Sequence, residues 1–207
     1  MRISIIFVAL LLIGCSGTDP AFIYNQTQAD AKVKELTELA TKPIQKYITN
    51  AELTDADKTS LATALPIIDQ IIQYDPVTIN SYNLKGKCLA ALGRTVDAKA
   101  AYLDGISLSV PRDDDTSKLI RSDTYTELAK IHVQENDFKS AELAAKNAIA
   151  TQDTDPAPHV ILGRIYAQQK KKQLAQDEAL RALLINADYE PARNLFRDLN
   201  PSLKASP

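Results

Sequence analysis

The sequence predicts an all-α fold, an α-solenoid in which short antiparallel helix pairs stack on one another. A two-helix pattern recurs between residues 82 and 189. Its second and third copies are 34 residues apart, and its first and second copies are 43 apart. Within each copy, apolar and small residues recur at the spacing of one helical face. A helix pair this short cannot bury both of its faces alone, so each pair must stack on the next.

The repeated positions form one set on each helix of a copy. Aromatic, small and apolar residues alternate on the first helix, and small or aromatic residues recur on the second. The first-helix set is Tyr82, Gly86 and Leu89, then Tyr125, Ala129 and His132, then His159, Gly163 and Tyr166. The second-helix set is Ala98, Tyr102 and Gly105, then Ala141, Ala145 and Ala148, then Ala175, Ala179 and Ala182. Small residues at this spacing allow the two helices of a pair to approach closely.

Three residues occupy the turn at which the first helix of each copy ends. They are Gly93, Asn136 and Lys170. Glycine and asparagine tolerate the left-handed conformation that is common just after a helix C-terminus. Two of the three turns are therefore well encoded by local sequence.

This pattern, with a period of 34 residues, resembles the tetratricopeptide repeat, or TPR. The resemblance implies a right-handed solenoid with about three full repeats. These repeats would cover residues 79–112, 122–155 and 156–189, inside a helical domain that spans residues 27–199.

Less regular segments flank the three repeats. A degenerate helix pair precedes them, and its second helix is predicted to begin near Thr54. The apolar face of that helix contains Leu61, Ala64, Leu65, Ile68, Ile71 and Ile72. After the last repeat, residues 191–199 suit a terminal capping helix, which a solenoid needs to shield its final repeat. Residues 200–207 are expected to form a flexible tail.

The longer spacing between the first two copies places a nine-residue insertion within residues 109–121. The insertion contains three consecutive carboxylates, Asp113 to Asp115. A calcium loop would need spaced oxygen ligands and a central glycine, which are missing. A solvated turn that caps the next helix at its positive end is the favoured interpretation.

The N-terminus has the features of a secretory signal over residues 1–14. A cationic start precedes an apolar run that is too short to span a bilayer. The following sequence, Leu12-Ile13-Gly14-Cys15, resembles a bacterial lipobox. The resemblance implies cleavage before Cys15, lipidation of that residue and a tether over residues 15–26. It also implies an outer-membrane address facing the periplasm in a Gram-negative source. An uncleaved anchor, or an ordinary signal with a chance cysteine, is the alternative.

Charge and cysteine content exclude several other classes of protein. The formal net charge is −2, whereas nucleic-acid binding needs a basic face. With Cys15 lipidated, Cys88 is left without a partner for a disulfide bond. Because Cys88 lies beside an apolar position of a repeat, we expect it to be buried as a small hydrophobic residue.

No motif in the sequence predicts catalysis. The only histidines, His132 and His159, fall at repeat positions where a ring packs between helices, so a core role is favoured. No phosphate loop, nucleophile motif or metal-ligand spacing occurs. We therefore expect a protein that is not an enzyme and binds no cofactor or metal.

A candidate binding groove follows from the first helices, which line the concave surface in TPR proteins. Lys87, Lys130 and Arg164 occupy equivalent places, one in each repeat. Asn83, Thr126 and Val160 lie one turn earlier, and Ala90, Val133 and Ala167 lie about one turn later. These residues predict a groove with a floor of small and apolar residues and a row of cations, suited to a protein or peptide that bears carboxylates. Ordinary solvated surface is the alternative.

The expected function is that of a lipid-anchored adaptor or scaffold that binds a protein partner in this groove. Assembly of a cell-envelope complex, such as pilus, secretion or cell-wall machinery, is an analogy at the level of the fold. The alternative is a lipid or small-molecule carrier, in which Ala90, Val133 and Ala167 line a closed apolar pocket. A hydrolase is disfavoured because no nucleophile is paired with a base.

Overall fold

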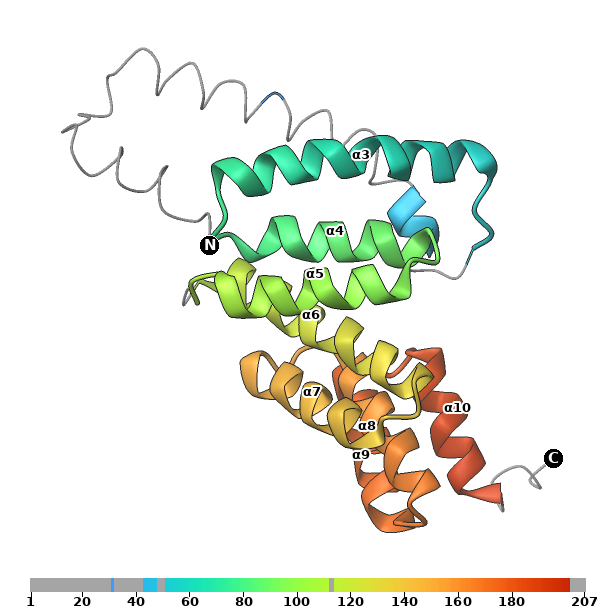
Figure 1. Ribbon diagram of the computed structural model, residues 1–207. Helices are drawn as coiled ribbons and strands as arrows, with labels where there is room; N and C mark the ends of the chain where they lie inside the picture. The colour runs from blue at the N-terminus through green and yellow to red at the C-terminus, as the bar shows by residue number, and fades with distance from the viewer. Residues whose placement is uncertain (1–30, 32–42, 48–50, 112–113, 202–207) are drawn as a thin grey trace. The chain divides into compact units, whose positions relative to one another are not determined.

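The computed structural model describes residues 31, 43–47, 51–111 and 114–201. Every regular element in these ranges is a helix (Figure 1), so the predicted all-α class is confirmed. The chain divides into two compact units, Met1–Tyr74 and Asp75–Pro207. The predicted signal segment, Cys15 and the tether lie outside the described residues, and so do residues 202–207 of the predicted tail.

The first unit contains a helical segment at residues 43–47 and the helix α3, Asp55–Tyr74. The start of α3 is fixed by a reciprocal capping arrangement. The backbone N–H of Asp57 donates to Oγ1 of Thr54 at 3.2 Å, and the backbone N–H of Thr54 donates to Oδ2 of Asp57 at 2.9 Å. Two backbone donors of the first turn are thereby satisfied, as in a capping box. The predicted start near Thr54 is confirmed.

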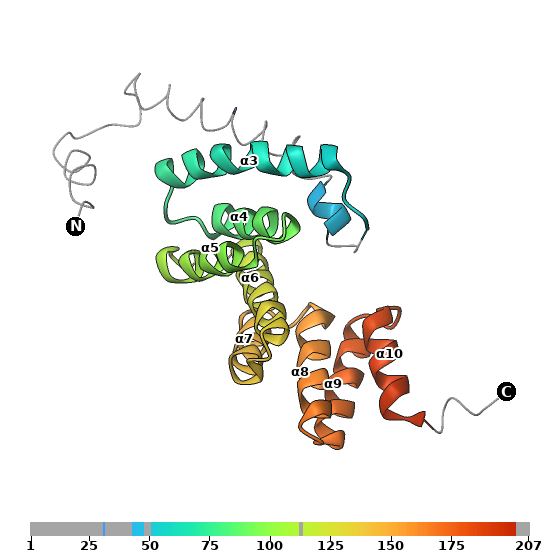
Figure 2. The ribbon, with the colours of Figure 1, turned by 45° about the vertical axis from the view of Figure 1, so that its right-hand side comes forward.

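The second unit consists of three helix pairs followed by a single helix (Figures 1 and 2). The three pairs are α4 Ile79–Ala91 with α5 Thr95–Leu108, α6 Asp115–Gln134 with α7 Phe138–Thr151, and α8 Pro156–Gln168 with α9 Lys172–Ile185. The last helix is α10, Glu190–Leu199. The helices of each pair pack on each other and on the next pair, as a solenoid requires.

The turns inside the three pairs share one geometry. Gly93, Asn136 and Lys170 have positive φ angles of 76°, 59° and 60°. In each turn, the next residue donates its N–H to a carbonyl five positions earlier, the longer hydrogen bond of a Schellman motif. The donors and acceptors are Arg94 and Leu89, Asp137 and His132, and Lys171 and Tyr166. The left-handed turns expected at Gly93 and Asn136 are confirmed, and Lys170 adopts the same conformation.

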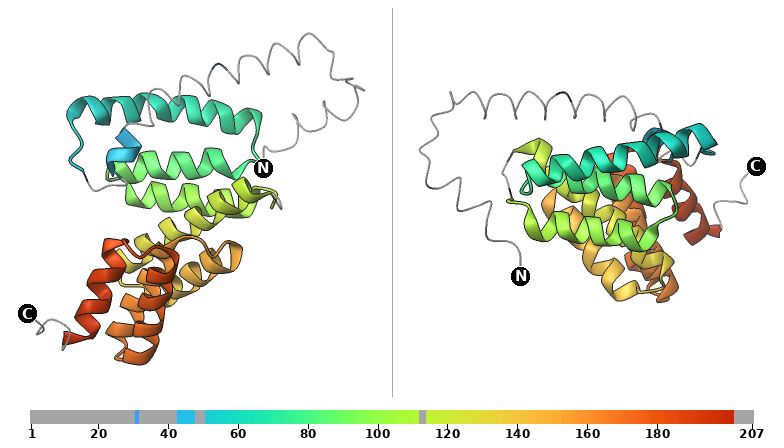
Figure 3. Two further views of the ribbon diagram at one scale, coloured as in Figure 1. Left: turned by 180° about the vertical axis from the view of Figure 1, so that it is seen from behind. Right: turned by 45° about the horizontal axis from the view of Figure 1, so that its top comes forward.

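The first and second helices of the pairs form different layers. Helix α4 packs on α6, and α6 packs on α8. Among the described residues, α5, α7 and α9 make no such contacts with one another. Helices that lie closer together occupy the inner side of a curved stack, so α4, α6 and α8 form the inner layer. Figure 3 shows the stack of α4 to α10 from two further sides.

Small residues on the second helices make the close packing possible. The seven alanines of the second-helix set are all fully buried, and so is Tyr102. The helix pairs are therefore built on the positions that the repeat pattern predicts.

Helix α10 closes the C-terminal end of the core. Its residues Ala192 and Leu195 pack in a buried cluster with Val160 of α8 and with Ala179 and Ala182 of α9. The predicted capping helix is confirmed, and it begins one residue earlier than the sequence suggests.

The insertion mainly lengthens α6 at its N-terminus. Asp114 caps this helix, because its side chain accepts hydrogen bonds from the N–H and the hydroxyl of Ser117 at 2.8 and 2.7 Å. The predicted helix-capping turn is therefore confirmed for Asp114. Further along α6, the guanidinium group of Arg121 donates to the backbone and side-chain oxygens of Ser109, at 3.3 and 2.8 Å. Arg121 thus connects the N-terminal part of α6 to the end of α5.

Candidate functional site

The exposed sides of α4, α6 and α8, here called the inner face, contain the three predicted cations. Lys87 lies on α4, Lys130 on α6 and Arg164 on α8. The structure thus places one cation on each helix of the inner layer. Their surroundings differ, however, and two of them are paired with carboxylates of α6.

Lys87 joins the first two repeats. Its Nζ atom lies 2.6 Å from Oδ2 of Asp123 on α6, and its side chain is only 15% exposed. The side-chain amide of Asn83 donates to the same carboxylate oxygen and to Oγ1 of Thr124, both at 2.9 Å. Removing one partner from a partly buried ion pair leaves the other charge uncompensated. Lys87 therefore belongs to a polar contact between α4 and α6.

Lys130 is also paired within the chain. Its Nζ atom donates to Oε1 of Glu127 at 2.7 Å, and the Glu127 side chain is almost completely buried. Glu127 is one turn away on the same helix, so the pair forms without a partner protein. Lys87 and Lys130, two of the three predicted cations, are therefore paired with carboxylates of α6.

Arg164 is the exception. Its side chain is exposed, and it forms no ion pair with any residue that the structure describes. The half-buried Tyr189, which precedes α10, lies close enough for its pKa to respond to nearby charges. Burial raises the pKa of Tyr189 and the carboxylate of Asp155 adds to this rise, whereas Lys130 and Arg164 act in the opposite direction. The inner face therefore ends in an available guanidinium group beside a tyrosine.

Three residues predicted to line the groove are buried instead. They are Asn83, Thr126 and Val160. Thr126 donates its hydroxyl to the carbonyl oxygen of Ser122, and Val160 packs in the C-terminal core. Asn83 faces α6, whereas Val160 faces α9 and α10. The prediction that these side chains line an open groove is corrected accordingly.

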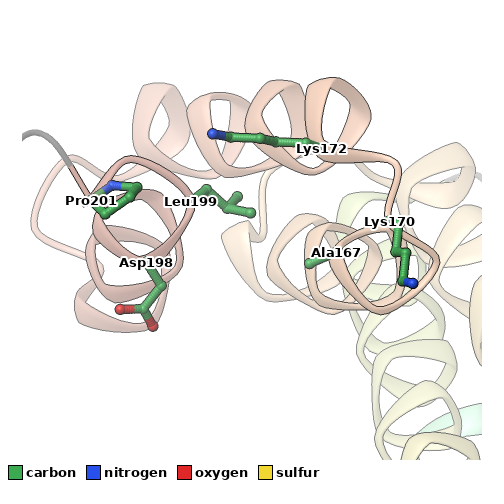
Figure 4. Close-up of a pocket in the computed structure, with 6 residues that line it drawn as sticks. All are labelled: Ala167, Lys170, Lys172, Asp198, Leu199 and Pro201. Atoms are coloured by element: carbon green, nitrogen blue, oxygen red, sulfur yellow. The ribbon is translucent and has the colours of Figure 1, made fainter.

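The other three predicted groove residues, Ala90, Val133 and Ala167, are partly exposed. Of these, Ala167 lines a pocket of about 310 Å³ between the third turn and the end of α10 (Figure 4). Its other lining residues are Lys170, Lys172, Asp198, Leu199 and Pro201. In Figure 4, Leu199 points from α10 toward α8 and α9. Ala90 and Val133 do not line this pocket, so the three residues do not form a shared cavity there.

His159 is buried, as its repeat position predicts, but it lies between two carboxylates. Its Nδ1 atom is 2.6 Å from Oε2 of Glu178, and its Nε2 atom is 2.7 Å from Oδ1 of Asp153. Burial alone would lower the pKa of His159, but the hydrogen bonds with Glu178 and Asp153 outweigh this effect and raise it. With a carboxylate at each ring nitrogen, the geometry suits the imidazolium form, in which both nitrogens donate.

Among the described residues, the free thiol of Cys88 is buried. Burial raises the pKa of the Cys88 thiol to about 12, so the thiolate is absent at neutral pH. Within the described ranges, no group of three histidine, cysteine or acidic residues is placed to hold a metal ion. The expected absence of enzymatic activity stays a prediction.

None of the helices in the described part of the chain combines the length and the hydrophobicity that crossing a bilayer requires.

Stacked helix pairs with Schellman turns, an inner layer of first helices and a terminal cap define the TPR-like α-solenoids. The structure of MamA is similar, with a TM-score of 0.58 and 15% identity over 74% of this chain and 86% of that chain. YrrB, described as a TPR protein with an unusual peptide-binding site, has a TM-score of 0.55 and 14% identity over 86% of this chain and 83% of its own. These structures show that the chain has the TPR fold. No protein-family model and no curated protein matches the sequence.

Proposed function

We propose that the chain is an adaptor that holds a protein or peptide partner on the inner face between α8 and α10. The observation that carries this proposal is the position of Arg164, which is exposed and has no ion pair among the described residues. Arg164 is three residues before Ala167, so both lie on one side of α8. Ala167 in turn lines the pocket at the third turn. A free charge and a pocket are thus available together.

This arrangement suits a partner segment with an acidic group and a small apolar side chain. A carboxylate binds Arg164 in a bidentate geometry, which gives both attraction and orientation. The apolar side chain enters the pocket, where Leu199 and Ala167 offer apolar surface. Lys170 and Lys172 at the rim of the pocket add attraction for acidic groups. Lys87 and Lys130 are already paired with the carboxylates of Asp123 and Glu127.

The fold and the sequence support a docking role. Repeat solenoids present extended surfaces that bind other proteins. The similar protein YrrB is described as having a peptide-binding site. The net charge of −2 lacks the excess of basic residues expected for binding nucleic acid.

The lipobox-like sequence supports a location in the bacterial cell envelope. Lipidation of Cys15 would hold the chain to a membrane, since several acyl chains anchor a protein stably. The adaptor would then act in the assembly of an envelope complex, on the periplasmic side of the outer membrane in a Gram-negative source. Mass spectrometry of the chain extracted from membranes tests this part. An unmodified Cys15, or a Cys15→Ser variant that remains membrane-bound, would refute the anchor.

A site-specific crosslinking experiment tests the docking site. A photoreactive amino acid replaces Ala167, and native membranes are irradiated with and without Arg164→Glu. The matched control carries the same photoreactive residue at Ala150, an exposed position on α7. We expect one dominant partner to crosslink from position 167, to be lost with Arg164→Glu and to be absent from position 150. Equal yields in all three samples would refute the inner face as the binding site. Crosslinks to lipid instead of protein would favour the carrier function.

A further inference from the structure

The C-terminal end of the solenoid has apolar side chains that α10 leaves uncovered. Leu180 and Leu184 of α9 are 45% and 86% exposed. Leu183, which packs against the terminal core, is only partly buried. Residues three and four positions apart lie on one side of a helix, so these leucines form one row. The exposed residues of the cap α10 are polar, among them Arg193, Asn194 and Arg197, so the uncovered apolar row belongs to α9 beside it.

A pocket of about 340 Å³ is formed by α9 and α10 at this row. Leu183 and Phe196 supply its apolar surface, and Arg193 and Arg197 supply its charged groups. The volume lies at the lower end of the range for ligand pockets and is sufficient for one large apolar side chain.

The two arginines are one helical turn apart on α10, and little in the described part of the chain neutralises them. Arg193 lies 3.5 Å from Asp188, whose side chain is almost fully exposed, so this pair is weak. Arg197 donates to the carbonyl oxygen of Arg193 and to the side-chain oxygen of Asn194. It makes no ion pair within the ranges that the structure covers. Guanidinium groups bind carboxylates in a planar, bidentate geometry, so the rim of the pocket favours an anionic partner.

We propose that this area docks an amphipathic acidic helix of a partner protein. We call it the end surface, and its residues are Leu180, Leu183, Leu184, Arg193, Phe196 and Arg197. The partner helix packs along α9 and α10 and places a large apolar side chain in the pocket. Two of its carboxylates, one turn apart, meet Arg193 and Arg197. This is helix-in-groove recognition, and it covers apolar surface that would otherwise face water.

The end surface is distinct from the docking site on the inner face. The inner site depends on Arg164 and on the pocket that Ala167 lines, whereas the end surface involves neither residue. The proposal therefore goes beyond the function proposed above, because one chain could hold two partners at once.

The experiment must distinguish the acidic helix from two other occupants, an anionic bilayer and a second copy of the chain. An anionic bilayer would also be attracted to the arginines, but its head groups have no fixed spacing that matches one helical turn. A second copy of the chain could cover the leucines without any need for the arginines. The spacing of the arginines at one helical turn favours the acidic helix.

The test measures binding of a synthetic helical peptide to the full chain by fluorescence anisotropy. The peptide has leucines along one stripe, flanked by glutamates one turn apart, and the control peptide has lysines in place of the glutamates. The variant is Arg193→Glu with Arg197→Glu. Its matched control is Lys139→Glu with Lys146→Glu on α7, which changes the net charge equally. Circular dichroism and thermal unfolding check that each variant is folded, and Leu184→Ser serves as a second variant of the end surface.

We expect the acidic peptide to bind, and the lysine peptide to bind at least about tenfold more weakly. The arginine variant and Leu184→Ser should each weaken binding of the acidic peptide by about tenfold or more, which corresponds to about 1.4 kcal/mol or more. The α7 control and Arg164→Glu should leave it unchanged. Equal binding of both peptides, or equal loss in the α7 control, would overturn the proposal.

Three further results would also overturn it. If Arg164→Glu abolishes peptide binding and the arginine variant does not, the peptide occupies the inner face. Sedimentation that shows self-association of the wild type, lost in Leu184→Ser, would identify a second copy as the occupant. Arginine-dependent binding to phosphatidylglycerol vesicles, without binding of the acidic peptide, would identify a membrane.

Discussion

The ring of Tyr102 on α5 lies directly over Gly86 on α4, so that a methyl group at Gly86 would overlap the ring. The ring carbon Cδ1 of Tyr102 would be only 2.5 Å from an added Cβ atom. The converse holds on the neighbouring turn, where a Cβ atom at Gly105 would lie 2.6 Å from Cβ of Tyr82. Each helix of the first pair therefore presents a glycine to a tyrosine of the other.

The contact between Gly86 and Tyr102 predicts whether Gly86→Ala raises or lowers the unfolding free energy. Replacing glycine by alanine inside a helix ordinarily stabilises it by roughly 0.5–1 kcal/mol. At Gly86 the overlap with Tyr102 reverses the sign, and we expect Gly86→Ala to lower the unfolding free energy by about 1–3 kcal/mol. Urea unfolding measures the change.

The second repeat provides the control for this prediction, because Ala129 and Ala145 occupy the equivalent positions. Gly86→Ala combined with Tyr102→Ala installs the same pair in the first repeat. Although Tyr102→Ala costs stability itself, adding Gly86→Ala to it should no longer be unfavourable, and a double-mutant cycle measures the coupling. A Gly86→Ala chain more stable than the wild type would contradict the packing described here.

The pKa of His159 predicts how stability depends on pH. Because the folded-state pKa is raised above its ordinary value of 6.5, the imidazolium contributes stability that is fully present below pH 6.5. This stability is lost as pH rises through the folded-state pKa. We expect the denaturant concentration at the unfolding midpoint to decrease as the pH is raised above 6.5, and His159→Gln should flatten this dependence.

A second variant identifies the source of the effect. Glu178→Gln removes one of the two carboxylates that hold the imidazolium and should reduce the pH dependence without abolishing it. A His159→Gln chain with the same pH profile as the wild type would show that the ring is not held as an imidazolium.

A glycine in place of Lys170 is expected to stabilise the protein. A residue with a side chain pays a steric cost at a φ of 60°, which glycine avoids and asparagine tolerates. Lys170→Gly should therefore raise the unfolding free energy by about 0.5–1 kcal/mol, seen as a melting temperature higher by about 1–4 °C. Lys172→Gly, which removes the same side chain from the first turn of α9, should instead lower the melting temperature.

The capping arrangement at the start of α3 predicts that the Asp57 carboxyl group has an unusually low pKa. The ammonium group of Lys46 and the hydrogen bonds from Thr54 lower the pKa of Asp57 from 3.8 to about 2. The stability that this carboxylate contributes is present above pH 3.8 and is lost as the pH falls toward 2. NMR titration of the Asp57 carboxyl carbon should find the low pKa in the full chain. Lys46→Met should raise it, and a value near 3.8 in the wild type would contradict the contact.

Local sequence predicts much of the architecture, because the signals that set it are local. Small residues at helical spacing mark the faces that pack, and Gly93 and Asn136 mark the turns. Lys170 adopts the same turn only because the helices on both sides impose it, so its own residue type gives no signal. The cap at Asp114 is also local, since it depends on a carboxylate three residues before its donor.

The candidate site is less predictable, because it depends on how the helices are rotated against one another. The sequence places Lys87 and Lys130 on the inner helices but does not show that Asp123 and Glu127 neutralise them. Asp123 is 36 residues from Lys87, so their contact exists only after α4 and α6 pack. The burial of Asn83 has the same cause. A search for acidic residues at helical spacing from each cation would have found Glu127.

The shared geometry of the three turns has a consequence for how such a chain can change in length. The hydrogen bonds of each turn join residues that are close in sequence. Helix α10 packs on a single helix pair, α8 and α9. A duplicated helix pair could therefore be inserted before α8, or a pair could be deleted, without the need for a new turn geometry inside the pairs. Each inserted pair would extend the inner layer by one helix width, about 8–10 Å. The length of the surface that a partner can contact can thus change during evolution by one repeat at a time, through duplication of the gene segment that encodes a repeat.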